Sequence, residues 1–221
     1  MHASINNLIE IQKQIQLKIF NQKKLLNTPN IIAVCKTFPI SEIIPLINHG
    51  HLHFGENKVN ESLEKWADIK FDFKNLNLHM IGKLQTNKVK HAISLFDYIH
   101  SLDSLKLAEK ISNEQLKQNK KVKIFIQINI GNEEQKNGIS ISEAEDFYKK
   151  CVSDFGLNII GFMCLPPNNQ KVSSYFSKME DLILKTNLKE LSMGMSSDYL
   201  EAIEHQSTYL RIGSKIFGSR S

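Results

Sequence analysis

The sequence predicts an α/β fold: a single (β/α)8 barrel of the TIM type with an extra N-terminal helix. Eight short apolar runs alternate with amphipathic segments, which is the pattern of parallel strands joined by crossover helices. The connections are short, and no Pro-, Gly- or Ser-rich linker marks a domain boundary. The 221 residues also suit one such barrel, for which roughly 200–250 residues are usual. We therefore expect one domain over residues 1–221.

The first expected element is a helix over residues 3–26, where apolar side chains recur at helical spacing before Pro29. Residues 1–28 are expected to pack on the barrel through this helix. Strands are expected at 31–36, 52–56, 78–82, 98–102, 123–130, 158–165, 190–194 and 208–213. Helices are expected at 40–49, 57–70, 85–95, 103–119, 142–153, 172–186 and 196–205, with a short piece after 213.

Eight such units also fit an open, doubly wound sheet. A dinucleotide-binding sheet of that kind needs a GxGxxG turn after its first strand, and this chain reads KTFP there. The sequence therefore favours the closed barrel.

Composition narrows the class of protein. The net charge is +5, but the lysines are scattered and no nucleic-acid-binding motif is present, so we expect no nucleic-acid partner. No apolar run approaches the ~20 residues of a membrane span, and the N-terminus does not resemble a signal peptide. Three cysteines without ligand spacing indicate reduced, packed thiols: Cys35, Cys151 and Cys164. We expect a soluble, cytoplasmic protein with no membrane association.

Lys36 closes the first apolar run, IIAVCK. Strand alternation places Ile32, Val34 and Lys36 on one face, so that Lys36 points into the barrel mouth if this face lines the barrel. Poor solvation there disfavours the ammonium form, and a neutral amine forms Schiff bases with carbonyl compounds. The alternative is a lysine that extends into solvent, and spacing alone does not separate the two.

The loops after the last two strands contain the features of a phosphate site. They read SMGMSSD (192–198) and RIGSKIFG (211–218). Gly194 and Gly213 let backbone amides approach an anion, while Ser196 and Ser214 add hydroxyl donors. Such turns also serve as helix caps. A phosphate site opposite an aldehyde-reactive lysine indicates pyridoxal 5'-phosphate (PLP).

Two further residues are candidates for contact with PLP. Arg211 can donate to the pyridine nitrogen, which would stay unprotonated because arginine keeps its proton. Its alternative is an ion pair with a carboxylate. Asn57 is expected at the cofactor ring or its 3'-oxygen, or as the cap of the following helix.

Other polar and sulfur side chains are interpreted as structural. His79 and His100 are expected either at the barrel mouth or as packed, hydrogen-bonded histidines. Met163, Met193 and Met195 are expected to pack the barrel top. No metal-ligand spacing or nucleophile motif is present, so we expect no metal.

Several segments resemble the signature blocks of the YggS/PROSC family, the pyridoxal phosphate homeostasis proteins, which are related to the N-terminal barrel of alanine racemase. The blocks are AVCKTFP, FGENKVNE, LHMIGKLQTNK, IHSLDS, FIQINIGNEEQKNGI, LSMGMSSDYLEAI and RIGSKIFGSR. The resemblance implies a fold-type III PLP barrel in which Lys36 holds PLP as a covalent aldimine. It also implies phosphate near Ser196, Gly213 and Ser214, with Arg211 near the pyridine nitrogen. Ser214 stands where the family commonly has threonine, and LHMIG replaces WHFIG.

The resemblance implies a PLP-binding protein that serves PLP homeostasis and delivery to apo-enzymes without catalytic turnover. The alternative is a fold-type III amino-acid racemase, which needs acid–base groups on both faces of the substrate Cα. In the alanine racemase family, the second base is a tyrosine from a C-terminal domain of the partner subunit. This chain ends at Ser221, just past the last strand, so we expect a carrier and a monomer. A class I aldolase-like enzyme is a third hypothesis, but only Lys36 supports it, since no other residue supplies an acid–base network.

Overall fold

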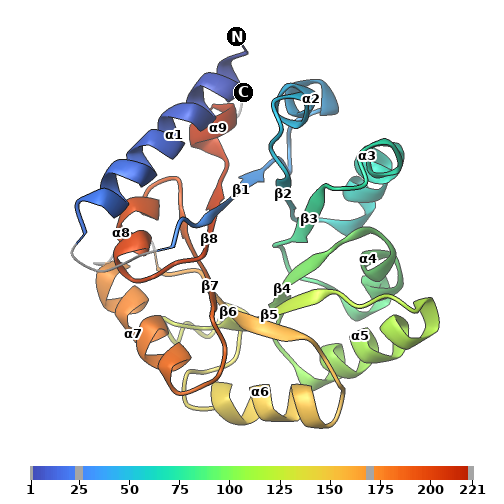
Figure 1. Ribbon diagram of the computed structural model, residues 1–221. Helices are drawn as coiled ribbons and strands as arrows, with labels where there is room; N and C mark the ends of the chain where they lie inside the picture. Colours follow the sequence, from blue (N-terminus) through green and yellow to red (C-terminus); the bar gives the residue numbers. More distant parts are fainter. Residues whose placement is uncertain (1, 23–26, 168–171, 219–221) are drawn as a thin grey trace.

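The computed structural model describes residues 2–22, 27–167 and 172–218. Within these ranges, parallel strands follow one another around a closed barrel, and the last strand pairs with the first (Figure 1). The helices surround the barrel on its outside (Figure 1). The predicted closed barrel is confirmed, and the open sheet is excluded.

The elements lie close to their predicted ranges. The strands are β1 Asn30–Val34, β2 His53–Glu56, β3 Asn77–Met80, β4 Tyr98–Leu102, β5 Lys123–Ile128, β6 Ile159–Cys164, β7 Glu190–Met195 and β8 Tyr209–Ile212. The helices are α1 Ala3–Phe20, α2 Ile40–Asn48, α3 Val59–Asp72, α4 Val89–Leu95, α5 Leu105–Gln118, α6 Ala144–Ser153, α7 Val172–Leu184, α8 Tyr199–Glu204 and α9 Ser214–Phe217, and a short 3-10 helix covers Thr86–Lys88.

Strand alternation divides the apolar residues between two cores. The small inner core fills the barrel and consists of Ile32, Tyr98, Phe125, Met163 and Tyr209. The larger outer core lies between the sheet and the helices. In β1, Ile32 belongs to the inner core and its neighbours Ile31 and Ala33 to the outer one. The predicted parity of the first strand is therefore confirmed.

The N-terminal helix α1 packs on the outside of the barrel against α8 and α9 (Figure 1). Its buried face includes Leu8, Ile11 and Ile15, and the Asn7 side chain donates to the carbonyl of Ile216 over 3.0 Å. The helix ends at Phe20, earlier than predicted, because Asn21 caps it. Asparagine is a poor helix former, since its side chain competes for backbone hydrogen bonds. Residues 23–26 of the predicted helix lie outside the described residues.

The first strand is shorter than predicted, and this changes the setting of Lys36. β1 ends at Val34, and the amide of Phe38 donates to the carbonyl of Cys35 over 3.1 Å, which closes a turn. Lys36 therefore lies in the turn after the strand, at the carboxyl end of the barrel, and not within the strand itself.

The three cysteines are free and buried, as predicted. Burial raises the pKa of the Cys151 and Cys164 thiols to about 12. No helix within the described ranges combines the length and apolar character that a membrane crossing requires.

Candidate functional site

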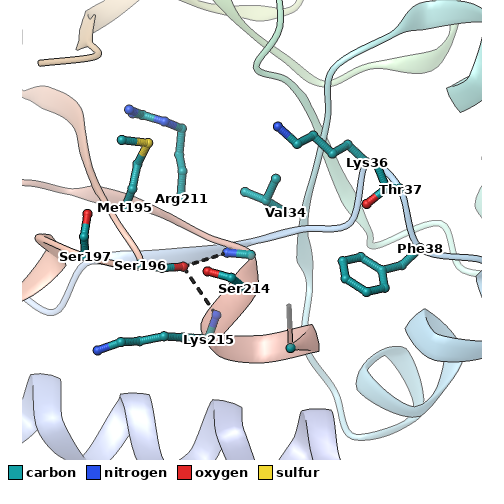
Figure 2. A pocket seen from close by; sticks show the side chains of 12 residues that line it. Val34, Lys36, Thr37, Phe38, Met195, Ser196, Ser197, Arg211, Ser214 and Lys215 are labelled. Atoms are coloured by element: carbon teal, nitrogen blue, oxygen red, sulfur yellow. Dashed lines mark hydrogen bonds between the residues drawn. The ribbon is translucent and has the colours of Figure 1, made fainter. Parts of the chain in front are cut away.

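A pocket of about 490 Å³ opens at the carboxyl ends of β1, β7 and β8. Figure 2 shows Lys36 on the side of β1 and Arg211 on the side of β8. Its lining is Val34, Lys36, Thr37, Phe38, Met195, Ser196, Ser197, Arg211, Gly213, Ser214, Lys215 and Gly218. The structure thus brings together five of the seven predicted site residues, Lys36, Ser196, Arg211, Gly213 and Ser214, which come from three separate segments of the sequence.

A buried polar cluster contacts the backbone just before Lys36. The Lys65 ammonium donates to the carbonyl of Cys35, the residue just before Lys36, over 2.9 Å. It also pairs with the Glu56 carboxylate at 2.8 Å, and Trp66 Nε1 donates to the same oxygen over 2.9 Å. Glu56 is only 1% exposed. These contacts fix the peptide that carries Lys36 into the pocket.

The opposite side of the pocket offers donors for an anion. The backbone amides of Gly213 and Lys215 both point to Ser196 Oγ, at 3.3 and 3.4 Å (Figure 2). Gly213 passes close to β1: a Cβ added at this residue would lie 3.2 Å from the Val34 carbonyl oxygen. Backbone amides and hydroxyls that converge in this way suit a phosphate group. The Lys215 side chain points away from these donors, and its ammonium lies 4.8 Å from the centroid of the Tyr199 ring (Figure 2).

Arg211 rises from β8 and is 5% exposed. One terminal nitrogen donates to Ser192 Oγ over 2.7 Å, and the other donates to the Cys164 carbonyl over 2.8 Å. Burial lowers the pKa of the guanidinium. None of the ion pairs between described residues includes Arg211, so the alternative of a carboxylate partner is wrong.

With this geometry in place, comparison with known proteins decides the family. Residues 13–221 match the family described as alanine racemase, N-terminal domain. The pyridoxal phosphate homeostasis protein of Haemophilus influenzae is 35% identical and covers 98% of this chain and 95% of its own. The chain belongs to the YggS/PROSC family.

Solved structures agree with that membership. PipY of Synechococcus elongatus without PLP superposes with a TM-score of 0.85 at 28% identity, covering 98% of this chain and 100% of its own. The same protein with PLP bound gives a TM-score of 0.78 at 28% identity, covering 94% and 100%. A family member with this barrel has therefore been observed with PLP.

Two candidate residues of this YggS/PROSC barrel, Asn57 and Gly194, lie outside the lining of the Lys36 pocket. Asn57 lies in a separate hollow of about 450 Å³, lined also by Met80 and Gln85, and not in the Lys36 pocket. It does not cap α3, whose cap position is Lys58. Gly194 does not line the pocket. It lies buried in β7 with φ of +90°, where an added Cβ would lie 2.6 Å from the Ala202 Cβ.

Sequence reasoning missed several lining residues: Thr37, Phe38, Ser197, Lys215 and Gly218. Their position in the sequence could have predicted them, because each lies in the same loop segment as a predicted site residue. Met163 packs in the inner core near the carboxyl end of β6, as expected, whereas Met193 packs in the outer core between the sheet and the helices and not at the barrel top. Met195 lines the pocket, because it is the last residue of β7 and the loop opens there.

His79 and His100 do not reach the mouth of the YggS/PROSC barrel. Both are fully buried inside it, so the packed, hydrogen-bonded reading is confirmed. His79 Nδ1 lies 2.9 Å from His100 Nε2, and His53 Nδ1 lies 2.9 Å from His79 Nε2. His100 Nδ1 in turn lies 2.9 Å from Ser192 Oγ. We call His53, His79, His100 and Ser192 the histidine network.

The buried histidines predict an acid-sensitive fold. Burial lowers the pKa of His51 to about 4 and holds the pKa values of His79 and His100 well below their usual range. Below about pH 6.5 the unfolded chain binds protons on these rings that the folded chain does not, so the free energy of unfolding rises with pH. Each such histidine contributes about 1.4 kcal/mol per pH unit until its folded-state pKa is reached. Urea unfolding between pH 5 and 7 measures this slope.

A matched pair of variants tests that pH prediction. His51→Gln keeps a donor near the His53 carbonyl, which His51 Nε2 contacts at 2.9 Å, and should reduce the slope by about one proton. His91→Gln, at an exposed position, should leave the slope unchanged. Equal slopes in the wild type and in His51→Gln would refute the assignment.

Proposed function

We propose that this protein binds PLP in the pocket at the carboxyl ends of β1, β7 and β8 and serves PLP homeostasis. In this proposal, the Lys36 amine and the PLP aldehyde form a Schiff base with release of one water. The observation that carries it is that one pocket contains Lys36, Arg211 and a group of anion donors. We call this group, Ser196 Oγ with the backbone amides of Gly213 and Lys215, the Ser196 cradle. The name of the H. influenzae relative and the PLP-bound form of PipY support the same ligand.

The residues present fit the chemical parts of PLP. The phosphate would take the hydroxyls of Ser196 and Ser214 and the amides of Gly213 and Lys215. Arg211 would face the pyridine nitrogen, to which it can only donate. Bound PLP supplies an aldehyde that captures amines reversibly. We also propose that Asn57 contacts the ring or its 3'-oxygen. This contact requires that bound PLP reach the hollow lined by Asn57.

The lining of the pocket favours holding over turnover. Racemisation needs a second acid–base group across the substrate from the lysine. Among the described residues that line this pocket, none is a tyrosine, histidine, aspartate or glutamate. We therefore infer a carrier that works without catalytic turnover. The match to the alanine racemase N-terminal domain makes an amino-acid racemase the second candidate.

The proposal extends to partners and place. We propose a monomer that delivers PLP to apo PLP-dependent enzymes in the cytoplasm, where buried free thiols such as Cys35 persist. The open, charged mouth of the barrel gives such partners access to the cofactor.

Transfer of PLP to an apo-enzyme tests this function. The PLP-loaded protein is mixed with an apo-aminotransferase in the presence of a phosphatase that destroys free PLP. The proposal expects the aminotransferase to regain activity, while free PLP at the same concentration restores much less. Equal restoration from both sources would contradict delivery, and sustained conversion of an L- to a D-amino acid would favour the racemase.

A further inference from the structure

A row of hydrogen bonds crosses the inside of the barrel and ends at Arg211. It starts at His53, the first residue of β2, at the end of the barrel opposite the pocket. It passes through His79 and His100 to Ser192, with 2.9 Å between partner atoms at each step. Arg211 then donates to Ser192 Oγ over 2.7 Å. The histidine network thus connects the two ends of the barrel.

The arginine at one end fixes the direction of every hydrogen bond. A guanidinium can only donate, so Ser192 Oγ accepts from Arg211. Among the described residues, the Ser192 side chain forms hydrogen bonds only with Arg211 and His100, so His100 Nδ1 is the acceptor left for its hydroxyl hydrogen. His100 therefore carries its proton on Nε2 and donates to His79 Nδ1. By the same reasoning, His79 donates through Nε2 to His53 Nδ1.

Stacking holds the two central rings in these orientations. The His79 ring stacks on Tyr98 with 4.2 Å between centroids and 20° between planes. The His100 ring stacks on Phe125 with 4.2 Å and 24°. Both histidines and Ser192 are fully buried, so water does not compete for their hydrogen bonds. Stacking and burial thus restrict rotation of the two rings.

The network also solves an electrostatic problem at Arg211. A buried cation is usually stabilised by a carboxylate in direct contact, but no ion pair between described residues includes this guanidinium, and the Asp198 carboxylate attracts it only from beyond ion-pair distance. Each partner in the network turns its acceptor atom towards Arg211, so the aligned dipoles stabilise the cation without neutralising it. Burial keeps His79 and His100 neutral, which avoids repulsion of the arginine. The positive charge of Arg211 thus stays available to the pocket.

We propose that Ser192, His100 and His79 are positioning residues that hold Arg211 in one orientation and leave its charge to the ligand in the pocket. This inference rests on the proposed function only in that Arg211 faces bound PLP. The arrangement of protons within the network is a property of the protein without ligand, and it can be tested separately.

Nitrogen NMR of the ligand-free protein tests the direction of the network. In protein labelled with ¹⁵N-histidine, two-bond couplings show which ring nitrogen carries the proton. His53, His79 and His100 should all be neutral, with the proton on Nε2. A proton on Nδ1 of His79 or His100 would overturn the inference, whatever the protein then binds.

Variants of Ser192 test the link to Arg211. Ser192→Ala removes the acceptor for Arg211 and the donor to His100, and should shift the His100 Nδ1 resonance and weaken PLP binding about tenfold. Ser192→Thr keeps the hydroxyl and should restore both to within about twofold. Ser207→Ala is the matched control, since Ser207 is also buried but donates to the Met193 carbonyl outside the network.

The possible outcomes separate the inference from the proposed function. Loss of PLP affinity in Ser192→Ala with rescue in Ser192→Thr supports the inference. Equal affinities in the wild type and Ser192→Ala, or equal losses in Ser192→Ala and Ser207→Ala, overturn it. Absence of PLP binding by the wild type would refute the proposed function, while the tautomers of the three histidines would still decide the direction of the network.

Discussion

Lys36→Ala is expected to weaken PLP binding by about 100-fold or more, equivalent to about 2.7 kcal/mol, and to abolish the visible absorption band of the Schiff base. The amine of Lys36 is the proposed covalent partner of the aldehyde. In the variant, the Ser196 cradle and Arg211 would hold PLP by non-covalent contacts alone. Titration of the ligand-free protein with PLP, followed by absorbance and fluorescence, measures both effects. The barrel should remain folded, because Lys36 lies in a turn and outside the apolar cores.

Two other variants separate covalent capture from charge. Lys36→Arg keeps a cation at the same position but supplies no neutral amine, so it should lose the absorption band as Lys36→Ala does. Lys215→Ala removes a cation beside the same pocket, whose ammonium lies over the Tyr199 ring, and should weaken binding by less than about tenfold while the band remains. A Lys36→Arg protein with an unchanged band would show that another lysine captures PLP.

Glu56→Ala is expected to lower the free energy of unfolding by about 3–5 kcal/mol, because it leaves a mostly buried ammonium without its partner. Glu56 Oε1 accepts from Lys65 at 2.8 Å, from Trp66 Nε1 at 2.9 Å and from the Cys35 thiol at 3.3 Å. The Lys65 side chain is 14% exposed, so water reaches it poorly. Urea denaturation at neutral pH measures the loss.

The same variant should also disturb Lys36. The Lys65 ammonium that Glu56 holds donates to the Cys35 carbonyl, and this contact fixes the peptide before Lys36. PLP affinity should therefore fall along with stability. Glu61→Ala is the matched control: it breaks the Lys58–Glu61 pair, whose side chains are 71% and 49% exposed, and should cost less than about 1 kcal/mol. Similar losses in the two variants would contradict the role given to the cluster around Glu56.

The sequence predicts the parts of this site that depend on one strand and the loop after it. Period-two alternation orients Ile32 and Val34 towards the barrel interior, and barrel geometry brings the loops after β7 and β8 beside the end of β1. Those two rules group Lys36, Arg211 and Ser196 in one site.

The features that sequence reasoning missed depend on side-chain contacts between different elements, including the neighbouring strands β2, β3 and β4. His53, His79 and His100 each lie on a different strand, and nothing in the sequence shows that their rings meet inside the barrel. Lys65 lies on a helix and looks like any surface lysine until Glu56 is seen beneath it. The sequence analysis expects Asn57, in the FGENKVNE block, at the cofactor or as a helix cap, but this residue follows β2 and lies in another hollow.

Borohydride reduction of the PLP-loaded protein, followed by peptide mapping, tests the central claim most directly. Reduction converts the Schiff base into a stable pyridoxyl-lysine, which mass spectrometry locates in the sequence. We expect the adduct on Lys36, in the peptide that contains AVCKTFP. An adduct found only on other lysines, such as Lys215, would contradict the account.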